Sequence, residues 1–394
     1  MSPPSYSDLS YPRVAVAAGG RWLCLLALLL TLGGCEALGY YTQAASGHLE
    51  LMRSRQSMAS ILDDPATEAD LKARLALVED LLEFAEDELG LPAEGQYRHY
   101  VALDRDAVVY NVMAAPRYDL APLLWCFPIA GCVAYRGYFE QSKAQAKAAE
   151  LAAEGFDVHV GGAAAYSTLG WFSDPLLSSF LWRDEAALAE LLFHELAHVR
   201  VYLPGDTAFN ESYATFVGRE GIRRWLAGRD RNDLREHWEM RTRVRQRFVD
   251  FVLGWRREMA DAYLALRQQE AAASDLEAAR ESLWSNMREA WLGQRPAAAQ
   301  PYDAFFLAEP SNARLNTVAD YHGRLPAFAE LFAAAQADFG TFHAEVAVLA
   351  EMAAQDRMAA FADLEKQAGD RKAALQGARS EHAWQYGQQQ VDQH

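Results

Sequence analysis

One short motif constrains the fold of this chain more than any other feature of its sequence. Residues 194–198 read H-E-L-A-H. Two histidines four positions apart face the same side only on an α-helix, so the motif predicts a helix over residues 184–201. On such a helix His194 and His198 can bind one metal ion while Glu195 points toward a bound water. Only about 0.035 such motifs are expected by chance at this composition, so we interpret the motif as a site for one zinc ion, with Glu195 as catalytic base.

The sequence after the motif offers a third metal ligand, which a catalytic zinc needs beside an open position. Residues 203–206 read L-P-G-D and predict a turn, and a second helix is expected over residues 208–226. This turn would lay the second helix beside the first, and we expect Glu211 to be the third ligand. Asp206 in the turn and His159 in an expected strand stay open as alternatives.

Several further side chains are candidates for supporting roles. Tyr213, Tyr321 and His322 are possible transition-state stabilisers, which would donate a hydrogen bond to the carbonyl oxygen as negative charge develops on it. The sequence does not rank these three. Asp184 or Asn210 could orient a histidine through its second ring nitrogen.

The beginning of the chain has the layout of a secretory signal. An apolar run over residues 22–32 follows two arginines and ends in small residues. Residues 32–35, L-G-G-C, resemble the lipobox of bacterial lipoproteins, which implies a signal peptide over residues 1–34 and lipidation of Cys35. Glu36 stands where an inner-membrane retention signal usually has Asp. We therefore expect a lipid-anchored protein of the bacterial cell envelope that faces the periplasm, at the outer membrane.

Composition excludes two classes of protein. The single long apolar run is shorter than the ~20 residues of a membrane-spanning helix, so a polytopic membrane protein is excluded. The 37 basic and 54 acidic residues give a formal net charge of -17, which repels phosphate backbones, so nucleic acid is not an expected partner. The expected partners are a peptide or protein substrate, and the membrane through the N-terminal lipid anchor.

The cysteines agree with export. Two of the four cysteines fall in the signal and at the lipidation site, which leaves Cys126 and Cys132. An oxidising periplasm favours a disulfide between them, and Pro128 and Gly131 would allow the chain to turn back. Two buried thiols on one extended strand, too far apart to bond, are the alternative.

Together these features resemble the aminopeptidase family of bacterial lipoproteins. The resemblance covers most of the mature chain and rests on the lipobox-type start, the H-E-L-A-H motif and the runs over residues 161–172 and 210–215. It implies a zinc peptidase acting at a free amino terminus. More broadly the pattern is similar to gluzincins, whose third ligand is a glutamate on a following helix, here Glu211. Twelve residues separate His198 from Glu211, fewer than in many gluzincins.

The predicted fold class is α+β, predominantly α. Apolar spacing predicts helices within residues 46–89, short β-rich runs predict a small sheet within residues 97–171, and a long apolar stripe predicts a helical bundle toward the C-terminus. One long helix is expected from Pro326 toward Leu364. The expected domains are a signal peptide, an N-terminal helical segment, a zincin-like metallopeptidase core, a helical bundle and a flexible tail: residues 1–34, 35–96, 97–228, 229–375 and 376–394.

The functional prediction is a zinc-dependent peptidase in which Glu195 moves a proton from the zinc-bound water to the leaving amine. Aminopeptidase action is what the resemblance implies, and it needs an acidic group to hold the substrate ammonium, for which Glu190, Asp206 and Asp174 are candidates. A zinc endopeptidase with the same site is one alternative. A non-catalytic lipoprotein scaffold with a structural zinc is the other, and the intact Glu195 argues against it.

Overall fold

The computed structural model describes residues 38–391 apart from residues 129, 166 and 169–171. The expected signal peptide and Cys35 lie outside the described residues. The chain divides into two compact units, residues 1–50 and 51–394, and residues 38–50 of the first unit are helical. Over the described ranges, no helix is both long enough and apolar enough to cross a membrane. All candidate metal ligands lie in the second unit.

Helix α3 (Ala69–Asp87) supports the motif helix α6 (Glu185–Arg200) from one side. The apolar residues of α3 recur at every third or fourth position, as the sequence predicts, so one face of the helix is buried. The short helix α2 (Met58–Asp63) precedes α3. A three-stranded sheet beside these helices joins segments far apart in the sequence, in the order β1-β2-β8. Its strands are β1 (Gln56–Ser57), β2 (His99–Val101) and β8 (Leu176–Leu177).

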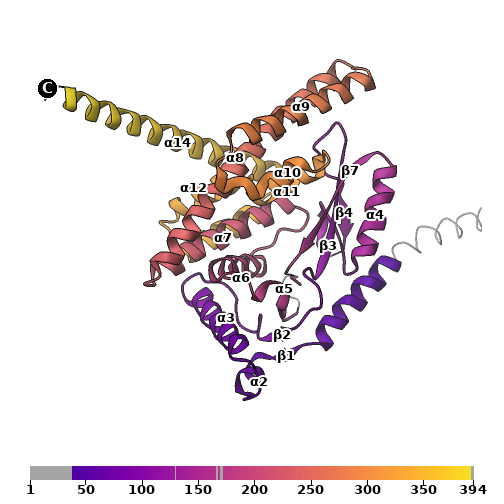
Figure 1. Ribbon diagram of the computed structural model, residues 1–394, viewed down its shortest axis with the longest axis vertical. Helices are drawn as coiled ribbons and strands as arrows, with labels where there is room; N and C mark the ends of the chain where they lie inside the picture. The colour runs from indigo at the N-terminus through magenta and orange to yellow at the C-terminus, as the bar shows by residue number, and fades with distance from the viewer. Residues whose placement is uncertain (1–37, 129, 166, 169–171, 392–394) are drawn as a thin grey trace, which may run out of the picture. The chain divides into compact units, whose positions relative to one another are not determined.

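A second, antiparallel sheet has the order β6-β3-β7, with β3 in the centre. Helix α4 (Gln141–Ala153) packs against β3 and β7 (Figure 1). A separate two-stranded hairpin, β4–β5, lies between β3 and β6 in the sequence. The strands are β3 (Val109–Pro116), β4 (Trp125–Phe127), β5 (Gly131–Val133), β6 (Arg136–Tyr138) and β7 (Phe156–Ala163).

Helices α6 and α7 (Thr207–Ala227) lie side by side and form the scaffold of the candidate site (Figure 1). An aspartate caps the N-terminus of each, Asp184 for α6 and Asp206 for α7, by accepting a hydrogen bond from a backbone N–H of the first turn. The short helix α5 (Ser178–Leu181) precedes α6.

The helices after α7 build a second hydrophobic core around aromatic side chains. The rings of Trp291 and Phe306, for example, stack with centroids 4.7 Å apart. This core contains most of the apolar stripe that the sequence shows at helical spacing, although Trp238, at the start of the stripe, packs against the first core. The buried ion pair between Arg280 and Asp157, at 2.8 Å, ties it to strand β7. The helices are α8 (Asn232–Gln268), α9 (Ala273–Gln294), η1 (Ala297–Tyr302), α10 (Asp303–Leu307) and α11 (Asn312–His322).

Three helices end the chain where the sequence predicts one long helix and a flexible tail. They are α12 (Leu325–Ala334), α13 (Phe339–Glu351) and α14 (Ala354–Val391). The single long helix is wrong, because Gln336 and Ala337 adopt positive φ and Asp338 caps α13. The segment expected as a flexible tail is helical up to Val391. The predicted class, α+β and predominantly α with a helical C-terminal region, is confirmed.

Candidate metal centre

The structure brings the three expected metal ligands together. The Nε2 atoms of His194 and His198 lie 3.2 Å apart, and Oε2 of Glu211 lies 3.3 Å and 3.6 Å from them. All three side chains are nearly buried, with exposed fractions of 12%, 8% and 11%. Across the part of the chain that the structure describes, no other group of three or more His, Cys, Asp or Glu side chains could hold a metal ion.

The geometry of this cluster fits a zinc ion. Atoms bound at ~2.0–2.1 Å around a tetrahedral zinc lie about 3.3 Å apart, close to the three observed separations. Oε2 of Glu211 and Nδ1 of His198 are buried and have no hydrogen-bond partner in the described chain. A buried carboxylate oxygen without a partner is costly, and a cation would satisfy it. Two imidazoles and one carboxylate are also a donor set that zinc accepts.

In the metal-free cluster, Glu211 and the imidazoles stabilise one another's charged forms. Burial by itself would raise the pKa of Glu211, but the imidazoles of His198 and His194 outweigh it and lower that pKa. Burial would likewise lower the pKa of His198, but Glu211 raises it overall. Glu211 is therefore ionised at neutral pH, which is the form that binds a metal.

The turn between the helices fixes the position of Glu211. The side-chain amide of the preceding Asn210 accepts from the N–H of Leu203 and donates to its carbonyl oxygen, each at 2.8 Å. Gly205 has a φ of +87°, a left-handed conformation that favours glycine. These contacts hold the first turn of α7 against the end of α6.

Two glycines let α6 and α7 approach closely. A Cβ at Gly218 would lie 2.6 Å from the carbonyl oxygen of Glu190 and 3.4 Å from the Cβ of His194. A Cβ at Gly221 would lie 2.8 Å from the ring of Phe193. A larger residue at either position would push apart the two helices that carry the ligands.

Glu195 lies beside the ligands and is partly buried. Burial raises the pKa of Glu195, against the opposing effect of His194 and His198. Tyr97 and Asp174 are electrostatic neighbours: burial and then the charge of Glu195 raise the pKa of Tyr97, and burial is the main cause that raises the pKa of Asp174 to about 6. The hydroxyl of Tyr97 is buried without a partner in the described chain. No sequence signal marks Tyr97, which lies in a loop before β2.

Of the three candidate transition-state stabilisers, Tyr321 lies against a candidate metal ligand. Its ring stacks on that of His194 with centroids 5.9 Å apart and planes at 10°. The side chain is 42% exposed and therefore accessible to a substrate. Tyr213 instead points into the core, where its hydroxyl bonds a buried histidine of α13. His322 lies 3.3 Å from a guanidinium nitrogen of Arg219.

The carboxylates that the sequence singles out have partners outside the cluster. These pairs are Asp206 with Arg324, Asp184 with Arg241, Glu190 with Arg245, and Asp174 with Thr168. Asp206 and His159 lie outside the metal cluster. The expectation that Asp184 or Asn210 orients a histidine is wrong, since Asp184 caps α6 and Asn210 bonds the backbone of Leu203.

The hairpin β4–β5 contacts the turn between α6 and α7. Cys126 and Cys132 form a disulfide across it. The carbonyl oxygen of Ala130, within the hairpin, accepts hydrogen bonds from the N–H of Gly205 at 3.0 Å and from the hydroxyl of Tyr202 at 3.4 Å. The disulfide-closed hairpin therefore supports the turn that positions Glu211.

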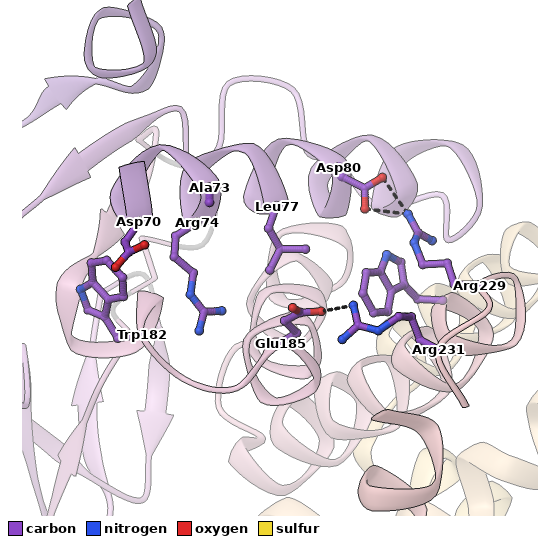
Figure 2. Close-up of a pocket in the computed structure, with 10 residues that line it drawn as sticks. Asp70, Ala73, Arg74, Leu77, Asp80, Trp182, Glu185, Arg229 and Arg231 are labelled. Carbon is purple, nitrogen blue, oxygen red and sulfur yellow. Dashed lines mark hydrogen bonds and ion pairs between the residues drawn. The ribbon is translucent and has the colours of Figure 1, made fainter. Parts of the chain in front are cut away.

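A separate cavity of about 530 Å³ lies at the N-terminal end of α6, next to α3 (Figure 2). Two ion pairs form between side chains that line it: Arg229 with Asp80, and Arg231 with Glu185. None of the cluster side chains lines this cavity. It is therefore distinct from the candidate metal centre.

Fold and site together define a predominantly helical α+β protein with a His-His-Glu cluster that could hold a metal ion, on two packed helices. The family model described as "Putative aminopeptidase" matches residues 39–361, and the chain belongs to this family. The family description indicates a peptidase. No curated protein and no solved structure matches the chain.

Proposed function

We propose that this chain is a zinc-dependent peptidase, and specifically an aminopeptidase. The proposal rests on the cluster of His194, His198 and Glu211 with Glu195 on the same helix, in a member of an aminopeptidase family. Structural zinc sites are closed by four protein ligands, whereas three ligands leave one position for substrate and water. A partly buried carboxylate beside that position suits a catalytic site.

The three ligands would hold the zinc, which when bound supplies a positive charge that polarises a peptide carbonyl and lowers the pKa of water. Glu195 accepts the proton of the attacking water. Because burial raises the pKa of Glu195, this carboxylate accepts and holds the proton more readily, and it then passes the proton to the more basic leaving amine. Tyr321, stacked on His194, donates a hydrogen bond to the carbonyl oxygen as negative charge develops there.

The experiment is metal analysis and peptide hydrolysis with the purified full-length protein. Wild type is compared with Glu195→Gln, Glu211→Gln and, as a matched control on the same helix, Glu185→Gln. We expect one zinc per chain and cleavage in wild type and control, zinc without cleavage in Glu195→Gln, and loss of zinc in Glu211→Gln. If wild type prepared with excess zinc retains no zinc, the proposed site is contradicted.

Peptides with free and acetylated amino termini decide between the candidate activities. Cleavage of free peptides alone supports the aminopeptidase, and cleavage of both kinds identifies an endopeptidase with the same site. Zinc binding with no hydrolysis of either kind would favour the non-catalytic scaffold.

We further propose that Cys35 is lipidated and that the protein faces the periplasm from the outer membrane. The proposal rests on the L-G-G-C sequence and Glu36. Labelled palmitate should enter wild type but not Cys35→Ser, and fractionation should move the variant from the outer-membrane fraction to the soluble one. Equal labelling of both would contradict it.

A further inference from the structure

A cleft of about 620 Å³ lies between α7, α8 and the junction of α11 with α12. Apolar side chains from α7, α8 and α12 contribute to its lining and could bury an aliphatic or aromatic side chain. They include Phe216, Trp238, Val249, Leu253, Leu325 and Pro326.

Arg219, on the α7 side of this cleft, is a nearly buried cation with incomplete compensation. Its side chain is 14% exposed, and its nearest carboxylate, that of Glu190, lies 3.9 Å away. Glu190 is held more closely by Arg245, at 2.9 Å. Two guanidinium groups thus share one carboxylate. The Nε atoms of both arginines are buried without a hydrogen-bond partner in the described chain.

The electrostatics of Arg219 agree with this geometry. Burial, followed by the charge of Arg245, lowers the pKa of Arg219 to about 10, so the site disfavours its own positive charge. Its other contacts, with Gln246 at 3.4 Å and His322 at 3.3 Å, supply no negative charge. Burial and the neighbouring arginines lower the pKa of His322 to about 3, so that histidine is neutral.

The remaining charged side chains of the cleft leave the excess positive. Glu220 is bonded to Arg223 at 2.7 Å, and Asp250, at the exposed rim, accepts from Gln246 at 2.9 Å. Arg257 also lines the cleft and makes no ion pair with a described residue. A guanidinium in a partly dry site binds a carboxylate through two parallel hydrogen bonds, and an anion here would restore the missing charge.

None of the candidate metal ligands lines this cleft, but neighbouring residues connect it to the candidate metal centre. His322 lines the cleft, and the neighbouring Tyr321 stacks on the metal-binding ring of His194. Glu190, beside Arg219, precedes His194 by one turn of α6. The cleft is thus linked to the candidate metal centre through residues next to a candidate ligand, and a bound peptide would have to extend from one to the other.

We propose that this cleft binds the carboxyl-terminal residue of a short peptide substrate. The free carboxylate would bind the guanidinium of Arg219, and an apolar side chain would pack against the apolar lining of the cleft. This inference rests on the proposed peptidase function and names its substrate class: short peptides that end in an apolar residue. Glu190, Asp206 and Asp174, the candidate anchors for a substrate ammonium, bond to other side chains. The charged end that the protein recognises is therefore the carboxyl terminus of the peptide.

The first arm of the test compares hydrolysis of Ala-Ala-Leu with that of its C-terminal amide. Wild type should prefer the free acid, and Arg219→Gln should raise KM for the acid roughly 10-fold or more while leaving the amide unchanged. Arg243→Gln, an exposed arginine of α8 outside the cleft, is the matched control and should behave as wild type. Equal use of acid and amide by wild type, or equal loss of both in Arg219→Gln, would overturn the inference.

The second arm measures binding without hydrolysis, by calorimetry with N-acetyl-leucine and its amide. Wild type should bind the acid only, and neither Arg219→Gln nor Ala329→Trp, which fills the cleft from an exposed position, should bind it. If wild type cuts no peptide but binds the acid in this way, the proposed peptidase fails and the carboxylate site stands. Absence of binding in wild type, or unchanged binding in Ala329→Trp, refutes the site itself.

Discussion

Replacing Gly218 by alanine should weaken the metal centre without touching a ligand. The new methyl carbon would lie 2.6 Å from the carbonyl oxygen of Glu190, and an ordinary contact of 3.4 Å requires a shift of about 0.8 Å between α6 and α7. Metal–ligand distances tolerate only about 0.2 Å, so Glu211 could no longer share one ion with His194 and His198 in the same geometry. Overpacking of this kind costs about 1–3 kcal/mol, partly offset by about 1 kcal/mol from the better helix propensity of alanine.

The assay is zinc affinity by competition with a chelator, together with thermal unfolding of the metal-free protein. We expect zinc affinity to fall about 10- to 100-fold in Gly218→Ala. Gly254→Ala is the matched control, since nothing lies within 4 Å of a Cβ at that position of α8. It should keep wild-type affinity and gain about 1 kcal/mol of stability. If both variants bind zinc like wild type and are equally stabilised, the close approach of the helices does not position the ligands.

Three further predictions concern stability. Arg280→Met should lower the free energy of unfolding, measured with urea, by about 3–5 kcal/mol, because it leaves the carboxylate of Asp157 buried without its ion-pair partner. Adding Asp157→Leu should recover part of this loss. No recovery would contradict this account. Replacing Cys126 and Cys132 by serine should lower the free energy of unfolding by about 2 kcal/mol, because the disulfide closes a short loop. It should also lower zinc affinity, because the hairpin supports the α6–α7 turn. Unchanged zinc affinity would show that the hairpin does not help to position the metal ligands. Burial lowers the pKa of His343 to about 4, so as the pH falls the unfolded chain takes up this proton before the folded one does. The free energy of unfolding should therefore fall by up to about 3 kcal/mol between pH 6.5 and 4. An equally steep loss in His343→Gln would assign the pH dependence to other groups.

The helix pair and its ligands could be predicted because everything that defines them is local. The motif sets the helical phase of His194 and His198, the L-P-G-D turn reverses the chain, and Glu211 follows within one turn of the next helix. The sequence also argues against Tyr213 as the transition-state stabiliser. It follows Glu211 by two residues, about 200° around the helix, and so faces away from α6.

Other parts of the site depend on packing between distant segments. Tyr321 reaches His194 because α11 packs on α7, more than a hundred residues earlier in the chain, and no local pattern encodes that contact. The shared use of Glu190 by Arg219 and Arg245 likewise requires α8 to lie against α6 and α7.

The break between α12 and α13 was missed for a different reason. Residues 336–338 read Q-A-D, with no proline or glycine to interrupt the helical spacing. The packing of Phe332, Phe339 and Phe342 against one another, with ring centroids 5.0–6.3 Å apart, favours the turn there.

The compactness of the ligand set has a consequence for how the chain folds. All three ligands fall within residues 194–211, on two helices joined by one tight turn, whereas the sheet and α11 are recruited from distant positions. Closing so short a loop costs little entropy, and contacts between neighbours in sequence form before distant ones. The helical hairpin would therefore be able to bind the proposed zinc ion before the rest of the second unit has assembled. In that order of events, the proposed ion would first act as a nucleus that holds two helices together.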